Sequence, residues 1–508
     1  MHRGGGSPPW PALSRQPWKA CRLCARRLFL RLRATAGPYI QAGMNNDNDR
    51  RDPGAPAAVS AAAAQQALAA AQELARDGTH YLRSVTDMAE RCPVVTRDAI
   101  YTDSGIKLVE KGTRIDSRLY DRLVRHTLRD PIDGLLGTEC TVDAAAIEAA
   151  ALQQCGGGSE GGCRLVELLS RAHGGPEPLL APLRGMLLPG PMAFRLTVMR
   201  EQRPELFAHS VRMMMVAVHL ALGLGWAARE TALLAEAALL HDIGVMHMDP
   251  MWSDPDHKVT GPDRKHLVAH PITAMLLLRA QGAYPAPVEA AVLEHHERMD
   301  GTGYPRGLRG PDISPMGQIL MLSEVAAAFF EKYSALAAQR LSLSLRLNHR
   351  KFPAGLSALL LPLLADGGGS AVALSPPPEE AGRMLDTLGG AFDHWARLRP
   401  QLPPSVLDRG SRHPAAFVEQ RLQALQQSLV EAGGHPGQEG EIREHLQGDP
   451  QGLAELALVR GEALWQLGSI VHATQRRWPE LGAQAPADPA NAAVAEWCAH
   501  CALLLSTA

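Results

Sequence analysis

Aromatic residues are scarce in this chain. Phe, Trp and Tyr together make up 5% of its 508 residues, whereas all hydrophobic residues make up 46%. Ala and Leu dominate the hydrophobic set, and both favour helices over sheets. The composition therefore predicts a mostly α protein.

Long uninterrupted apolar runs are also lacking. A membrane-spanning helix needs about 20 apolar residues in a row. The best candidate, around Leu356 to Leu364, is broken by Pro362 and stopped by Asp366. We therefore expect a soluble cytoplasmic protein with no membrane partner.

Neither sign of charge is in excess. Lys and Arg total 51, Asp and Glu total 53, and the formal net charge is −2. Such a chain has no global field that would attract a polyanion. We therefore expect no nucleic-acid partner, and any phosphate-bearing ligand must be held by a local site.

The chain holds eight cysteines without the dense spacing of a disulfide framework, so we expect reduced thiols. Two pairs have Cys-x-x-Cys spacing, Cys21 with Cys24 and Cys498 with Cys501. A four-thiolate zinc site would have to bring both chain ends together. We favour an unstructured tail for the first pair and a buried helix face for the second.

Glycine and proline clusters divide the chain. A Gly-rich linker occupies 156–162, and a Gly-rich and Pro-rich break occupies 367–378. Four segments are predicted: a disordered or mis-assigned extension at 1–60, a helix plus a small strand-containing module at 61–155, a helical domain at 163–352, and a C-terminal helical region at 380–508. Met44 is an alternative start of the protein.

The 61–155 segment carries two short β-type runs, Val94 to Thr96 and Ile106 to Val109, followed by a predicted helix from Ser117 to His126. In the C-terminal region, Phe417 to Val430 and Leu453 to Thr474 have the three-and-four spacing of amphipathic helices. Neither region contains a motif that identifies a ligand.

Several polar residues in the 163–352 segment have the spacing of metal ligands. Glu205 and His209 are four apart in a predicted helix, and so lie on one face. His241 and Asp242 interrupt an apolar helix that ends at Gly244. The ordinary interpretations are a solvated surface pair and a hydrogen-bonded core pair, but a divalent cation would also neutralise a buried carboxylate.

Two further motifs follow along the chain. His270 precedes Pro271 at a predicted helix start, and His295 and His296 end another apolar helix. Neighbouring imidazoles on one turn can bind two ions, although they can also be plain surface residues. A loop with two glycines comes next, formed by Asp300, Gly301, Thr302, Gly303, Tyr304 and Pro305.

Taken together and in this order, these motifs resemble the HD-GYP family of the HD phosphohydrolase superfamily, over about residues 201–352. The resemblance implies a helical domain that holds two or three divalent ions, iron or manganese, and hydrolyses cyclic di-GMP. Carried over by position, it implies a ligand set in which Asp242 bridges two ions: Glu205, His209, His241, Asp242, His270, His295, His296 and Glu324. His241 and Asp242 are the implied catalytic pair, and Asp300, Gly301, Gly303, Tyr304 and Pro305 the implied substrate loop.

The chain departs from the family pattern twice. Glu324 stands where the family has a ligating Asp, and its extra methylene moves the carboxylate. Val245 stands where the family usually has a Lys that contacts the substrate phosphate, and the loss of that charge should weaken turnover. His247, Lys258, Arg264 and Lys265 are candidates to replace it.

The leading hypothesis is a metal-dependent phosphodiesterase for cyclic di-GMP in bacterial signalling, in which bound metal lowers the pKa of water and stabilises phosphoryl charge. Val245 and Glu324 favour an alternative, a degenerate HD-GYP protein that binds metal and nucleotide and acts as a signalling adaptor through its Gly-Tyr-Pro loop. A third possibility is an HD hydrolase acting on another nucleotide. The oligomeric state is left open.

Overall fold

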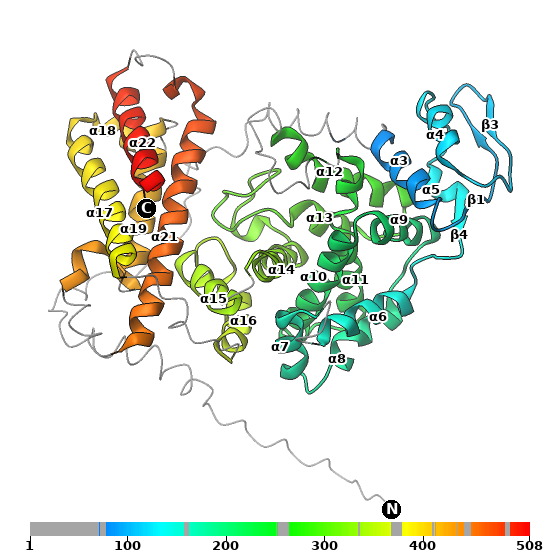
Figure 1. Cartoon of the computed structure of the whole chain (residues 1–508), viewed down its shortest axis with the longest axis horizontal. Coiled ribbons are helices and arrows are strands. Elements are labelled where there is room, and N and C mark those ends of the chain that lie inside the picture. Colours follow the sequence, from blue (N-terminus) through cyan, green and yellow to red (C-terminus); the bar gives the residue numbers. More distant parts are fainter. Residues whose placement is uncertain are drawn as a thin grey trace, which may run out of the picture. The chain divides into compact units, whose positions relative to one another are not determined.

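The computed structural model describes residue 71 and residues 78–156, 162–249, 251, 264–333, 336–366, 378–408, 411, 413–432, 434–440, 449–482 and 488–507. Helices make up most of this part of the chain, which confirms the predicted fold class (Figure 1). The predicted 1–60 extension and the Cys21 and Cys24 pair lie outside the described residues.

A small module of short helices and strands comes first. Its elements are α3 (Thr79–Met88), β1 (Val94–Thr96), β2 (Ile100–Tyr101), β3 (Lys107–Val109), α4 (Ser117–Val124), α5 (Ile132–Leu135), β4 (Leu136–Thr138) and α6 (Ala144–Cys155). Strands β1 and β3 lie where strands were predicted, whereas β2 and β4 were not predicted. The carboxylate of Asp116 caps α4 by accepting hydrogen bonds from the backbone of Arg118 and Leu119 at 3.1 and 3.2 Å.

Strands β1 and β4 pair antiparallel, with Val94 opposite Thr138. The same register places Cys92, two residues before Val94, opposite Cys140, two residues after Thr138. These two cysteines form a disulfide with a Cα–Cα distance of 6.3 Å. The expectation that all cysteines are reduced is therefore wrong for this pair, because the pairing that joins them depends on the unpredicted strand β4.

The central part of the chain is helical. It consists of α7 (Arg164–Ala172), α8 (Glu177–Leu180), η1 (Ala181–Gly185), α9 (Gly190–Gln202), α10 (Pro204–Gly223), α11 (Ala228–Leu240), η2 (Ile243–His247), α12 (Arg264–Gln281), α13 (Ala286–Glu294), η4 (Gly310–Asp312), α14 (Pro315–Lys332), α15 (Ala337–Leu347) and α16 (Ala354–Asp366). One hydrophobic core runs through these helices and the preceding module. The module therefore packs on the helices that carry the predicted metal ligands.

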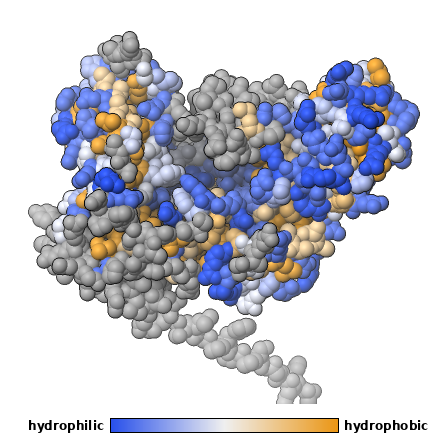
Figure 2. Space-filling view, in the orientation of Figure 1, coloured by the Kyte–Doolittle hydropathy of each residue, from blue (hydrophilic) through white to orange (hydrophobic). Residues whose placement is uncertain are grey.

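Helix α10 is long and apolar enough to cross a membrane, although its sequence is not an uninterrupted apolar run because it contains His209 and Arg212. About 72% of its apolar window is buried inside the structure, mainly by α11 and α14. This burial is typical of the core helix of a globular domain. On the face shown in Figure 2, hydrophobic patches of the described surface are separated by hydrophilic residues.

The C-terminal region is a helical bundle. Its helices are α17 (Pro378–Leu398), α18 (Pro404–Leu407), α19 (Pro414–Glu431), α21 (Pro450–Arg477) and α22 (Pro489–Thr507) (Figure 1). Its core holds Trp395 and Trp497, and the indole of Trp497 donates to the carbonyl of Ala391 at 3.0 Å. Cys498 and Cys501 are buried in this core, and burial raises the pKa of the Cys498 thiol to about 12. The interpretation of this pair as a buried helix face is confirmed.

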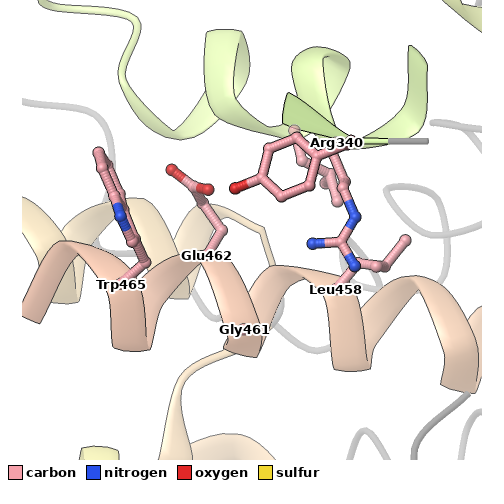
Figure 3. A pocket seen from close by; sticks show the side chains of 7 residues that line it. Arg340, Leu458, Gly461, Glu462 and Trp465 are labelled. Carbon is pink, nitrogen blue, oxygen red and sulfur yellow. The ribbon is translucent and has the colours of Figure 1, made fainter. Parts of the chain in front are cut away.

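The bundle contacts the central helices through α15 and α21. A small hollow of about 40 Å³ lies between these helices, and Arg340 and Glu462 point into it from opposite sides (Figure 3). A volume of this size holds only a few water molecules. The hollow is therefore a packing gap and not a nucleotide site.

The first prediction concerns the Cys92–Cys140 disulfide. Closing a chain segment of 48 residues restricts the unfolded state, which corresponds to about 4 kcal/mol in the loop-entropy model. We expect the Cys92→Ser/Cys140→Ser protein to lose up to that free energy of unfolding in urea titrations, while Cys155→Ser, a change at a free cysteine, has a small effect. A count of eight reactive thiols in unfolded, unreduced protein would contradict the disulfide.

The second prediction concerns Glu236 on α11, which is 2% exposed and accepts one hydrogen bond, from the backbone of Leu187. Burial raises its pKa from 4.5 to about 7. The folded state then holds a proton that the unfolded state releases, so the stability present below pH 4.5 is lost as the pH rises through 7.

Glu236→Gln should remove this pH dependence and stabilise the protein at pH 8 by about 3 kcal/mol. Urea unfolding at pH 5 and pH 8 measures the effect, with Glu205→Gln, a change at an exposed carboxylate, as the control. If the free energy of unfolding changes between pH 5 and pH 8 by the same amount in the wild type and in Glu236→Gln, Glu236 is ionised in the folded protein.

Candidate metal centre

Five helices bring the predicted ligands together. His209 projects from α10, His241 and Asp242 follow the last residue of α11, and His270 lies within α12. His295 and His296 follow the end of α13, and Glu324 lies in α14. Helix α10 packs on α11 and α14, and α13 packs on α12 and α14. Residues far apart in the sequence therefore meet at one point of the core.

The ligand atoms form two adjoining groups. Within each group, one ligand atom from every residue lies within 4.8 Å of the others. The first group contains Asp242, His270, His295 and His296, and the second contains His209, His241 and Glu324. The structure thus brings together seven of the eight predicted ligands.

Asp242 lies between the two groups. Its Oδ1 is 3.3 Å from Nε2 of His270 and 3.6 Å from Nε2 of His295. Its Oδ2 is 3.2 Å from Nε2 of His241, which belongs to the second group. One carboxylate therefore presents one oxygen to each group, which is the geometry that a bridging ligand requires.

Hydrogen bonds to helix carbonyls orient the imidazoles of His241 and His295. Nδ1 of His241 donates to the carbonyl of Ala238 at 2.7 Å, and Nδ1 of His295 donates to the carbonyl of Val292 at 2.6 Å. Both partners lie three residues earlier on the same helix. Each bond fixes the ring with Nε2 turned toward the shared centre, which is the nitrogen that a metal ion would bind.

Glu331 orients His209 in the same way. Its Oε1 accepts from Nδ1 of His209 at 2.7 Å, and it also forms an ion pair with Arg212. Sequence reasoning missed this residue. The signal was its position seven residues after Glu324, two turns further along the same face of α14.

The donor set fits divalent metal ions. Nε2 of His241 and Oδ1 of Asp242 are fully buried and have no hydrogen-bond partner among the described residues. Buried polar atoms normally have such a partner. Imidazole nitrogens mixed with carboxylate oxygens suit iron, manganese or zinc better than magnesium alone.

Burial and neighbouring imidazoles shift the pKa values of Asp242 and His296 in the first group. Burial alone would raise the pKa of Asp242, but His241, His270 and His295 hold that pKa well below its usual value. Burial, together with the neighbouring imidazoles His295 and His270, lowers the pKa of His296 well below its usual value. These shifts favour an ionised Asp242 and a neutral His296, which are the forms that bind metal.

Glu324 takes part although it replaces the family's Asp. Its Oε2 is 2.9 Å from Nε2 of His209 and 3.6 Å from Nε2 of His241. Burial would raise its pKa, but His209 and the other imidazoles hold the pKa well below its usual value. The longer side chain still reaches the second ligand group.

Glu205 is the one predicted ligand outside both groups. It lies on the exposed first turn of α10, one turn before His209. The helical spacing was right, but only His209 faces the core. Ligation by Glu205 remains a prediction.

The Gly-Tyr-Pro loop packs against the first ligand group. The ring of Tyr304 stacks on that of His296, with centroids 4.6 Å apart. The backbone of Gly303 lies so close to Glu297 that a Cβ there would be 2.4 Å from its backbone atoms. The predicted substrate loop therefore lies next to the predicted ligands.

Two buried carboxylates, which sequence reasoning did not assign, hold this loop. Glu297 is fully buried and accepts hydrogen bonds from the backbone of Arg306, Gly307 and Leu308 at 2.8, 3.1 and 2.9 Å. Glu294 accepts one from the backbone of Ser314 at 2.8 Å. Both flank the His295 and His296 pair in sequence, which was the available signal.

The C-terminal bundle also contacts the loop. Arg421 on α19 donates to Asp300 at 3.2 Å, with both side chains partly buried. The backbone of Met299 donates to the carbonyl of Lys351 at 3.1 Å. The loop is thus held from the metal side and from the bundle side.

The charge missing at Val245 is not replaced by His247. Val245 is half-buried on η2, but the imidazole of His247 is 2% exposed and hydrogen-bonded to Arg195 at 2.8 Å. His247 is therefore not placed to replace the missing charge, because the turn of η2 directs it into the core. Lys258 lies outside the described residues, as do the side chains of Arg264 and Lys265.

Comparison with known proteins places the site in a known domain. Residues 197–349 match the family model of the HD domain, and both ligand groups lie within this match. Over 107 residues, 21% of this chain, the sequence is 33% identical to a 3'3'-cGAMP-specific phosphodiesterase of Vibrio cholerae. Over 90 residues, 18% of this chain, it is 39% identical to a cyclic di-GMP phosphodiesterase of Pseudomonas aeruginosa. Each match spans 22% of the length of the relative.

Among solved structures, an HDG"Y"P protein from Bdellovibrio bacteriovorus aligns with 54% of this chain and 94% of its own. The two sequences are 18% identical, and the TM-score is 0.29.

The third prediction concerns the ligand groups. Asp242→Asn keeps the side-chain volume but removes the charge shared by both groups, so it should lower Mn(II) affinity at least about tenfold. Glu230→Gln, a change at an exposed carboxylate on α11, should leave the affinity unchanged, and Glu205→Gln tests whether Glu205 is a ligand. Metal titration of the purified proteins, with a metal count after desalting, measures both. A similar loss of affinity in Glu205→Gln would make Glu205 a ligand after all.

Proposed function

Since residues 197–349 of this chain match the HD domain family and the motifs within them resemble those of the HD-GYP family, we propose that it is a metal-dependent phosphodiesterase that hydrolyses cyclic di-GMP. The observation that carries the proposal is the pair of ligand groups that share Asp242 and lie beneath the Gly-Tyr-Pro loop. Relatives that act on cyclic dinucleotides support the substrate class.

The residues of the site suit hydrolysis of an anionic phosphodiester. Divalent ions, which we propose to be iron or manganese, would lower the pKa of bound water and offset charge on the phosphoryl oxygens. Asp242 supplies one oxygen to each group, and the helix carbonyls behind His241 and His295 keep their Nε2 atoms aimed inward. These residues therefore need little reorganisation during the reaction.

The loop lies against the first ligand group. Tyr304, stacked on His296, presents an aromatic ring next to the ligand groups, where a nucleobase can be recognised by stacking. We propose this loop as the substrate-contacting segment and as the docking point for signalling partners, in the cytoplasm where the second messenger acts.

The fourth prediction tests turnover directly. Protein purified without oxygen and loaded with Fe(II) or Mn(II) should linearise cyclic di-GMP, with product formation followed by chromatography. His241→Ala should reduce kcat/KM by at least roughly two orders of magnitude, about 3 kcal/mol of transition-state stabilisation. Glu230→Gln, at an exposed carboxylate of α11, serves as the matched control, and 3'3'-cGAMP is assayed beside cyclic di-GMP to separate the two substrates of the relatives.

The adaptor alternative rests on Val245 and predicts a different outcome. If the wild type binds metal but turns over neither dinucleotide, while Val245→Lys gains turnover, the chain has lost an activity that its ligand groups still allow. If neither protein hydrolyses a cyclic dinucleotide, the phosphodiesterase proposal fails.

A further inference from the structure

A chain of buried polar side chains links the N-terminal module to the turn after the metal ligands. It consists of Tyr81 on α3, Asp133 on α5, Arg195 on α9 and His247 on η2, and we name it the buried relay. Their exposed fractions are 1, 3, 6 and 2%. None of these residues is a ligand, and their elements pack directly on one another.

The contacts within the relay are continuous. The hydroxyl of Tyr81 and Nη2 of Arg195 donate to the two carboxylate oxygens of Asp133. Nη1 of Arg195 donates to Nε2 of His247 at 2.8 Å, since a guanidinium can only donate. The rings of Tyr81 and His247 stack nearly parallel, with centroids 5.0 Å apart and an angle of 9°.

Each member of the relay therefore depends on the others. Arg195 also lies over the ring of Tyr81, with its guanidinium carbon 4.7 Å from the centroid. A buried charge that loses its partner is strongly destabilising. A displacement of Asp133 in the module must therefore be followed by Arg195 and, through it, by His247.

His247 ends the turn that begins after Asp242. Helix η2 covers Ile243–His247, and the backbone of Val245 donates to the carbonyl of Asp242 at 2.9 Å. Gly244 lies against α12, where a Cβ would be 2.2 Å from the carbonyl oxygen of His270. The turn therefore begins at Asp242 and touches the backbone of His270, so a shift of the turn would change the spacing of these two ligands.

We propose that the N-terminal module controls the metal centre through the buried relay, with Arg195 and Asp133 as positioning residues. An event that moves α3 or α5 changes how well Asp242 and His270 are placed to bind metal. The inference deepens the proposed function by naming how the site is regulated, and it rests on that function only for its effect on turnover.

The fifth prediction tests the relay with Co(II) as the probe, in the full chain. Asp133→Asn keeps the volume but removes the charge that holds Arg195. We expect about a tenfold loss of Co(II) affinity and a shift of the visible Co(II) spectrum, which reports ligand geometry. Asp116→Ala, which removes the cap of α4 in the same module without touching the relay, should change neither.

Two results would overturn the proposal. One is a folded Asp133→Asn protein, by circular dichroism, with unchanged Co(II) affinity and spectrum. The other is an equal loss in Asp116→Ala, which would make the effect a general weakening of the module. Should Asp133→Asn fail to fold, Tyr81→Phe removes a single hydroxyl and replaces it as the test, with about a threefold loss expected and no change overturning the proposal.

The same experiment separates the relay from the proposed function. A shifted Co(II) affinity in a chain that hydrolyses no cyclic dinucleotide would leave the relay standing and the phosphodiesterase proposal refuted. Hydrolysis by the wild type together with unchanged Co(II) binding in the variants would refute the relay and support the phosphodiesterase proposal.

Discussion

A buried carboxylate surrounded by imidazoles is the constraint on which the site depends. Asp242 is largely shielded from water, and an ionised carboxylate there is costly unless nearby groups compensate it. His241, His270 and His295 lie within 3.6 Å of its oxygens and come from three different elements. The helices that carry them must therefore meet at one point, and the packing of α10 to α14 follows from that requirement.

Much of the candidate site was predictable because the order of its motifs resembles that of a known family, which implied the ligand set position by position, whereas helical spacing linked only Glu205 with His209. His209, His241 and Glu324 meet as that resemblance implied. Glu205 shows the limit of such reasoning, because spacing gives the relative direction of two side chains but not which of them faces the core.

Two features could not be predicted because they depend on contacts between distant segments. The Cys92–Cys140 bond needs the pairing of β1 with β4, and β4 is too short to be recognised alone. His247 was one of four candidates to replace the charge missing at Val245, but it packs on Tyr81, more than 160 residues earlier. The mostly α fold class, in contrast, follows from composition, which no tertiary contact changes.

The close approach at Gly244 has a consequence for how the domain tolerates variation. The separation between Asp242 and His270 is set where one backbone touches another, and not by the size of side chains that fill a gap. Core residues elsewhere in α11 and α12 can then change volume and repack without altering the distance between the two ligands. Because the distance between the two ligands depends on Gly244, it is insensitive to the substitutions that change side-chain volumes in most hydrophobic cores.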